Sequence, residues 1–93
     1  MNTLTPQQAR QRALANAQGL AHFRTLMDAC LAGSRANTNG DAEMAGVHLE
    51  CAERALLDLE VCAMYAPLSE ALGTARWACS TLAANLGLVQ VEA

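Results

Sequence analysis

Gly33-Ser-Arg-Ala-Asn-Thr-Asn-Gly-Asp41 interrupts a chain that otherwise consists of Ala, Leu and short polar runs at helical spacing. Glycine stands at positions 33 and 40, and the Asn, Ser and Asp residues accept left-handed backbone or form turns of their own. We therefore predict a loop that reverses the chain here. Gly33 is the expected left-handed stop of the preceding helix.

The segment before this loop has the start signals of a helix. Thr5 can cap, Pro6 suits the first helical position, and Gln8 completes a Thr-x-x-Gln capping box. We predict a helix over about 6–32 with an apolar face at alternating steps of three and four. That face contains Ala9, Ala13, Asn16, Leu20, Phe23, Met27, Cys30 and Leu31. Asn16 is its polar member, either a solvated position or a register-setting pair across a helix dimer.

The segment after the loop predicts two further helices, over about 40–66 and 67–86, separated at Pro67. Pro67 removes a backbone donor and disfavours helical backbone at the residue before it, so the chain kinks or restarts there. The expected core face of the second helix contains Ala45, His48, Leu49, Ala52, Ala55, Leu56, Leu59, Cys62, Ala63 and Ala66. That of the third contains Leu68, Ala71, Leu72, Ala75, Ala78, Cys79, Leu82 and Leu86.

Composition agrees with an all-α domain. The chain has 93 residues, of which 53% are hydrophobic and 3% aromatic, and it contains no Ile, a residue that β domains favour. Residues 1–93 are expected to form a single helical domain, as a three-helix bundle or a helical dimer. A domain of this size buries a modest share of its surface, which makes self-association an expectation.

Charge and segment composition exclude several partners. The net charge is −3, and the six basic residues, all Arg, are scattered along the chain without a basic stripe, so we expect no nucleic-acid binding. The beginning of the chain has neither a basic leader nor an apolar run, which favours a cytoplasmic location. The uncharged stretch 77–91 is too short and polar to span a bilayer, so no membrane association is expected.

The cysteines and histidines offer little chemistry. Cys30, Cys51, Cys62 and Cys79 form no Cys-x-x-Cys pair, and three of them lie on predicted core faces, where cysteine behaves as a small buried hydrophobe. His48 lies three positions from Cys51, which leaves soft-metal binding as an alternative. We find no base, nucleophile and orienting group in one pattern, and therefore expect no enzyme activity, catalytic residue, metal or cofactor.

One resemblance bears on that alternative. Asp28-Ala-Cys-Leu31, and Asp41-Ala-Glu-Met44 followed by Cys51, are similar to segments of the cysteine-rich four-helix proteins that hold copper(I) inside a bundle. The resemblance implies a helical bundle that holds copper(I). Together with the spacing of His48 and Cys51, it gives the alternative of a helical bundle that handles a soft metal, copper or zinc, with His48 and cysteines. Most matching positions that carry cysteine in those proteins carry other residues here, among them Val47, Arg54 and Asp58, so we do not assign the chain to that family.

Two apolar features exceed what one core requires. Trp77 points away from the core face of the third helix, where it is either an interface anchor or an internal ring in a helix buried on both sides. The second helix has an extra apolar flank. The predicted partner-binding residues are Leu57, Val61, Met64, Gly73, Trp77, Thr81 and Leu88. Aromatic residues among small neighbours are typical of interface anchors. We therefore predict a non-enzymatic interaction protein that acts as a homodimer or as a regulator or inhibitor of a larger partner. The Arg-only, Ala-rich composition suits a bacterial or phage protein.

Overall fold

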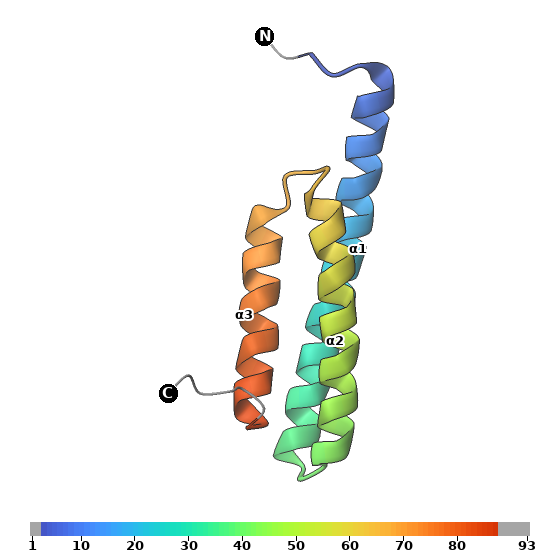
Figure 1. Ribbon diagram of the computed structural model, residues 1–93. Coiled ribbons are helices and arrows are strands. Elements are labelled where there is room, and N and C mark those ends of the chain that lie inside the picture. Colours follow the sequence, from blue (N-terminus) through green and yellow to red (C-terminus); the bar gives the residue numbers. More distant parts are fainter. Residues whose placement is uncertain (1–2, 88–93) are drawn as a thin grey trace.

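The structure, a computed structural model, describes residues 3–87 and consists over this range of three helices and their connections (Figure 1). They are α1 (Pro6–Thr38), α2 (Ala42–Ala63) and α3 (Ser69–Asn85). α2 returns alongside α1, and α3 then runs in the same direction as α1 (Figure 1). The described part of the chain has no strand, which confirms the all-α class and the three-helix bundle.

The start of α1 agrees with the prediction, but its end does not. The Thr5 hydroxyl accepts from the Gln8 amide at 3.1 Å, and the Gln8 side chain accepts from the Thr5 amide at 3.0 Å. The predicted stop at Gly33 is wrong, because α1 continues to Thr38 and Gly33 is buried within it. A Cβ atom on Gly33 would lie 2.8 Å from Leu82 Cδ2 and 3.2 Å from His48 Cβ. Gly33 therefore permits close helix packing instead of ending the helix.

The chain reversal is shorter than the predicted loop and occupies residues 39–41. Gly40 has a φ of +80°, a left-handed conformation that glycine adopts without a steric penalty. The next residue, Asp41, caps α2 by accepting from the Met44 amide at 3.1 Å. Of the residues that predicted a long loop, only 39–41 form the turn, and residues 33–38 remain helical as the end of α1.

The second break lies at Pro67, as predicted, although both adjacent helices are shorter than expected. α2 ends at Ala63 instead of residue 66, and α3 spans Ser69–Asn85 instead of 67–86. The Cys62 carbonyl accepts from the amides of both Tyr65 and Ala66, which closes the end of α2. Leu68, just before α3, is buried and belongs to the core.

The core confirms the predicted faces of α2 and α3 and corrects that of α1. Its buried members are Leu26, Cys30, Leu49, Ala52, Ala55, Leu59, Cys62, Leu68, Ala75, Ala78, Cys79 and Leu82. In the α1 face, Ala9, Ala13, Leu20 and Leu31 are exposed. Leu26, which the prediction omitted, is fully buried. The observed buried face of α1 is rotated relative to the predicted one. The prediction missed this because the buried face includes two glycines, which a pattern of apolar residues does not count.

α1 and α3 lie side by side in a fixed register. A Cβ atom on Gly19 would collide with Leu68 Cδ1, and one on Gly33 would be tight against Leu82 Cδ2. Each of these two pairs is 49 positions apart in the sequence, so a residue of α3 lies level with the α1 residue numbered 49 lower. α3 is also tied to α2 by the exposed ion pair between Arg76 and Glu60, at 2.9 Å.

Within the residues that the structure describes, none of the helices combines the length and the apolar character needed to cross a lipid bilayer.

Candidate interaction surfaces

An apolar groove runs between α1 and α3 on one side of the bundle. It encloses about 290 Å³. Its lining residues are Met27, Cys30, Leu31 and Ser34 of α1, with Trp77, Ala78, Thr81, Leu82 and Asn85 of α3. The floor is formed by core residues such as Cys30 and Leu82, and the edges are open to solvent. We call this feature the α1–α3 groove.

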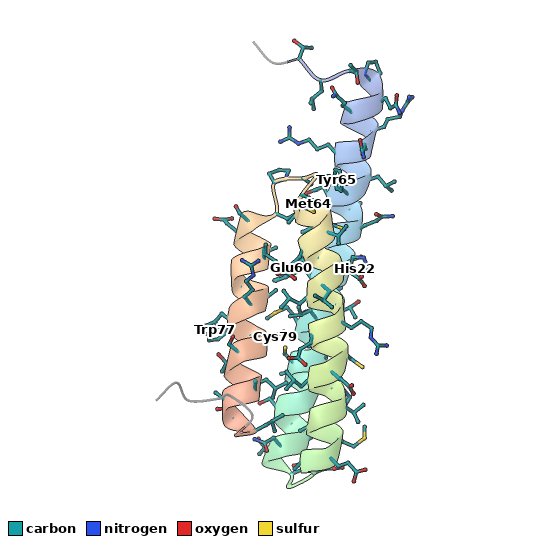
Figure 2. All side chains as sticks on the ribbon, in the orientation of Figure 1. His22, Glu60, Met64, Tyr65, Trp77 and Cys79 are labelled. Atoms are coloured by element: carbon teal, nitrogen blue, oxygen red, sulfur yellow. The ribbon has the colours of Figure 1, made fainter. Side chains whose placement is uncertain are left out.

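Trp77 forms one edge of the α1–α3 groove. Its side chain lies on the outer side of α3, away from α2 (Figure 2). The residue is 66% exposed, and Leu31 on the opposite edge is 54% exposed. Trp77 is therefore outside the core, and the alternative of an internal ring is wrong. The groove and the tryptophan together present an unpartnered apolar surface.

The outer side of α3 is poor in charge near Trp77. Of the predicted site residues on this helix, Gly73 is exposed and Thr81 is half-buried in the groove. From Trp77 to the end of α3, the helix has no charged residue. Depletion of charge around an aromatic residue is characteristic of the central part of protein interfaces. Leu88, the remaining predicted site residue of this group, lies outside the described residues.

The other predicted site residues form a second surface on α2. Leu57, Val61 and Met64, which we call the α2 flank, are 64%, 57% and 76% exposed. Val61 also lines a shallow groove between α1 and α2 of about 290 Å³, to which Leu14 and Tyr65 contribute. The structure therefore divides the predicted partner-binding residues between two surfaces.

Sequence reasoning missed Leu14 and Tyr65. Leu14 lay outside the apolar face proposed for the first helix, and Tyr65 was not assigned to any surface. Its position could have drawn attention to Tyr65, which stands two residues before the predicted break at Pro67. Both side chains are exposed next to the α2 flank.

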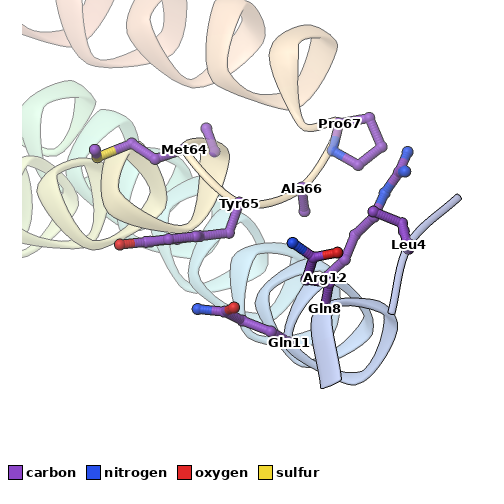
Figure 3. A pocket seen from close by; sticks show the side chains of 9 residues that line it. Leu4, Gln8, Gln11, Arg12, Met64, Tyr65, Ala66 and Pro67 are labelled. Atoms are coloured by element: carbon purple, nitrogen blue, oxygen red, sulfur yellow. The ribbon is translucent and has the colours of Figure 1, made fainter. Parts of the chain in front are cut away.

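A third concave feature lies where α1 extends past the α2–α3 connection (Figure 3). This corner encloses about 420 Å³. Leu4, Gln8, Gln11 and Arg12 line one side, and residues 63–67 line the other. It is wide and partly polar, and Arg12 is its one charged lining residue. We find no arrangement of groups in it that would act on a substrate.

Two buried thiols meet between α1 and α3. Cys30 and Cys79 belong to the same core cluster, and Cys79 lies between the helices (Figure 2). Burial raises the pKa of the Cys79 thiol to about 12, and the neighbouring Cys30 adds to this increase. Burial also raises the pKa of Cys30, which the hydrogen bond to Cys79 partly offsets. Both groups are therefore neutral thiols near pH 7, which makes them weak nucleophiles.

The proposed soft-metal ligands have different surroundings. His48 is half-buried and its Cβ faces α1 at Gly33, whereas Cys51 is exposed. Within residues 3–87, no group of three or more His, Cys, Asp or Glu side chains is placed to hold a metal ion. The geometry therefore adds no observation in favour of a metal centre with His48.

Comparisons of this chain with protein-family models, with curated proteins and with solved structures found no match. The function is therefore inferred from the surfaces described above.

Proposed function

We propose that this chain is a small, non-enzymatic helical interaction protein that acts by protein–protein contact, as a homodimer and as a regulator or inhibitor of a larger protein. The observation that carries the proposal is Trp77, 66% exposed at the edge of an apolar groove. The tryptophan ring has a large apolar surface, and burial of that surface against a partner stabilises a complex more than burial of most residues does.

The second apolar surface supports contact with a larger partner. The α2 flank lies on a different side of the chain from the α1–α3 groove and shares none of its lining residues. A protein with two such surfaces can contact another molecule with each. We assign the α1–α3 groove to one contact and the α2 flank to another.

Affinity capture from an extract of the source organism tests this function. The unmodified chain and the control variant Val47→Ala should recover the same partner, because Val47 is an exposed apolar residue of α2 outside both surfaces. Val61→Glu places a charge in the α2 flank and should abolish recovery of a larger partner. Trp77→Ala should reduce the contact made at the groove, since truncating an interface anchor typically costs about 2 kcal/mol or more.

Two outcomes would contradict the proposed function. A chain that recovers no partner and sediments as a monomer would have no contact for either surface to make. Equal recovery by Val61→Glu, Trp77→Ala and the control would place any contact elsewhere.

A further inference from the structure

We propose that the occupant of the α1–α3 groove is a second copy of the chain, packed antiparallel about a two-fold axis so that Trp77 of each copy lies in the groove of the other. This inference rests on the proposed function and names the partner for one of its surfaces. The first argument is shape. The protruding side chain and the groove stand side by side on one face, which is the arrangement a self-complementary interface requires.

The register between α1 and α3 determines the level at which the two copies meet. With the offset of 49 positions, Trp77 lies level with Asp28 of α1. The apolar α1 residues Leu20, Met27 and Leu31 lie on both sides of that level. A two-fold axis at this level therefore places each tryptophan opposite the apolar part of the other copy's α1, next to Met27 and Leu31.

The second argument is charge complementarity. In an antiparallel pair, a residue seven positions before the axis on one copy meets a residue seven positions after it on the other. Glu70 is seven positions before Trp77, and Arg35 is seven positions after Asp28. Glu70 of one copy therefore lies level with Arg35 of the second copy, and the symmetry produces this ion pair twice.

Both charged residues are available for this contact. Arg35 lies in the last turn of α1 and Glu70 in the first turn of α3, and both are exposed. Among the described residues, neither forms an ion pair within one copy. Within one copy, Glu70 and Arg35 are separated by the rise of fourteen helical residues, roughly 21 Å along the helix axis, so they cannot pair there. The pairing therefore requires a second copy.

Sedimentation velocity over about 1 to 100 µM tests the dimer, because a dimer dissociates on dilution. Trp77→Ala should weaken self-association by at least about 30-fold, which corresponds to the loss of a single anchor, and by more if both anchors of the dimer contribute fully. Val47→Ala should leave it unchanged. Helix content measured by circular dichroism verifies that each variant is folded, which we expect because both substituted side chains are exposed.

Charge reversal tests the orientation. Arg35→Glu and Glu70→Arg should each weaken self-association several-fold, because each places like charges together at two positions. The double variant should recover most of the lost affinity. A parallel or differently positioned dimer would show no such recovery, which would overturn the proposed arrangement.

Cross-linking gives an independent readout. In a Cys51→Ser background, Arg35→Cys combined with Glu70→Cys should form a covalent dimer on oxidation, whereas each single cysteine variant should not. A chain that remains monomeric over the full concentration range overturns the second-copy inference. If such a monomer still recovers a different protein, and Trp77→Ala abolishes that recovery, the proposed function stands and the groove belongs to that other partner.

Discussion

Gly33 and Gly46 are both helical glycines, but a methyl group has room at only one of them. At Gly33 a Cβ would lie 2.8 Å from Leu82 Cδ2 and 3.2 Å from His48 Cβ, whereas at Gly46 nothing lies within 4 Å. Gly46→Ala should therefore raise the free energy of unfolding by up to about 1 kcal/mol, through helix propensity alone. Gly33→Ala should lower it by about 1–2 kcal/mol, because the packing strain exceeds the same propensity gain.

Urea unfolding of the two variants measures this difference. Their opposite signs distinguish packing from propensity, since both substitutions replace Gly by Ala inside a helix. An increase in stability for Gly33→Ala would show that α1 can move away slightly from α2 and α3 at no cost, contrary to the packing described.

The cysteines should differ strongly in reactivity. Cys51 is exposed, whereas Cys30 and Cys79 are buried and burial raises the pKa of both thiols. At pH 8 a thiol-specific disulfide reagent should modify one cysteine rapidly and the buried ones at least about tenfold more slowly, because only thiolate reacts. Cys51→Ser should remove the rapid phase. Rapid modification of any thiol in the folded Cys51→Ser variant would contradict the burial.

For single residues, the sequence predicted the helix cap correctly but did not predict the structural role of Gly33. The capping box of Thr5 and Gln8 follows from local hydrogen bonding, so residue types alone predicted it. Gly33 was misassigned because the same residue type serves to end a helix and to admit a neighbouring one. Which role applies depends on Leu82, a residue distant in the sequence.

Leu57 and Leu59 lie on opposite sides of α2 and differ in burial. Leu59 is fully buried, and Leu57 is 64% exposed. Leu59→Ala should lower the free energy of unfolding by about 2–5 kcal/mol, because it removes a buried side chain and leaves a cavity. Leu57→Ala should change it by less than about 0.5 kcal/mol, as is usual for an exposed site. Chemical denaturation measured at one protein concentration tests the pair, and a similar loss in both would place Leu57 in a stabilising contact.

The first turns of α1 stand apart from the bundle (Figure 1). Residues 3–14 are exposed throughout, and Ala15 is the first buried residue of the helix. A chain that begins at Ala13 should therefore lose less than about 1 kcal/mol of unfolding free energy, since an isolated helical extension has little stability of its own. Thermal unfolding compared with that of the full chain measures the loss. A larger loss would show that these turns are packed in solution.

The elements differ in how far their buried faces follow from the sequence. The faces of α2 and α3 are rich in Ala and Leu at helical spacing, and the pattern placed them correctly. In α1, two apolar patterns compete: one through Leu26 and one through Leu20 and Leu31. The buried one contains Gly19 and Gly33, so periodicity of apolar residues placed Cys30 in the core correctly but included the exposed Leu20 and Leu31.

For the molecule as a whole, the buried thiols make stability depend on alkaline pH. The pKa of Cys79 is raised from 9.0 to about 12 by burial, so above pH 9.0 the unfolded chain loses this proton while the folded chain retains it. The unfolded state then binds fewer protons, and the free energy of unfolding falls as pH rises, by at most about 1.4 kcal/mol per pH unit for each such thiol. The contribution is fully present below pH 9.0.

Urea unfolding from pH 8 to 10.5 measures this dependence. Cys79→Ala should reduce its slope, because it removes the thiol whose pKa burial raises. An identical slope in Cys79→Ala would assign the effect to other groups that titrate in this range.

The architecture was largely predictable from the sequence, but the surfaces were only partly so. Three helices and two breaks follow from local signals such as Pro67 and the Asn-rich turn. The sequence placed Trp77 and Val61 outside the core faces, yet grouped them as one site. Their separation depends on how α1 packs against α2 and α3, which local patterns do not determine.

The left-handed backbone at Gly40 determines whether the chain folds upon itself. α1 and α2 are separated by residues 39–41 alone, and Gly40 is the only one of the three with a positive φ. Right-handed helical backbone at Gly40, together with helical backbone at Asp41, whose ψ is 75° here, would join the two helices into one continuous rod. α2 and α3 would then have to pack on α1 of another chain, in an exchange of helices between copies. The backbone of this three-residue turn thus keeps the bundle within a single chain.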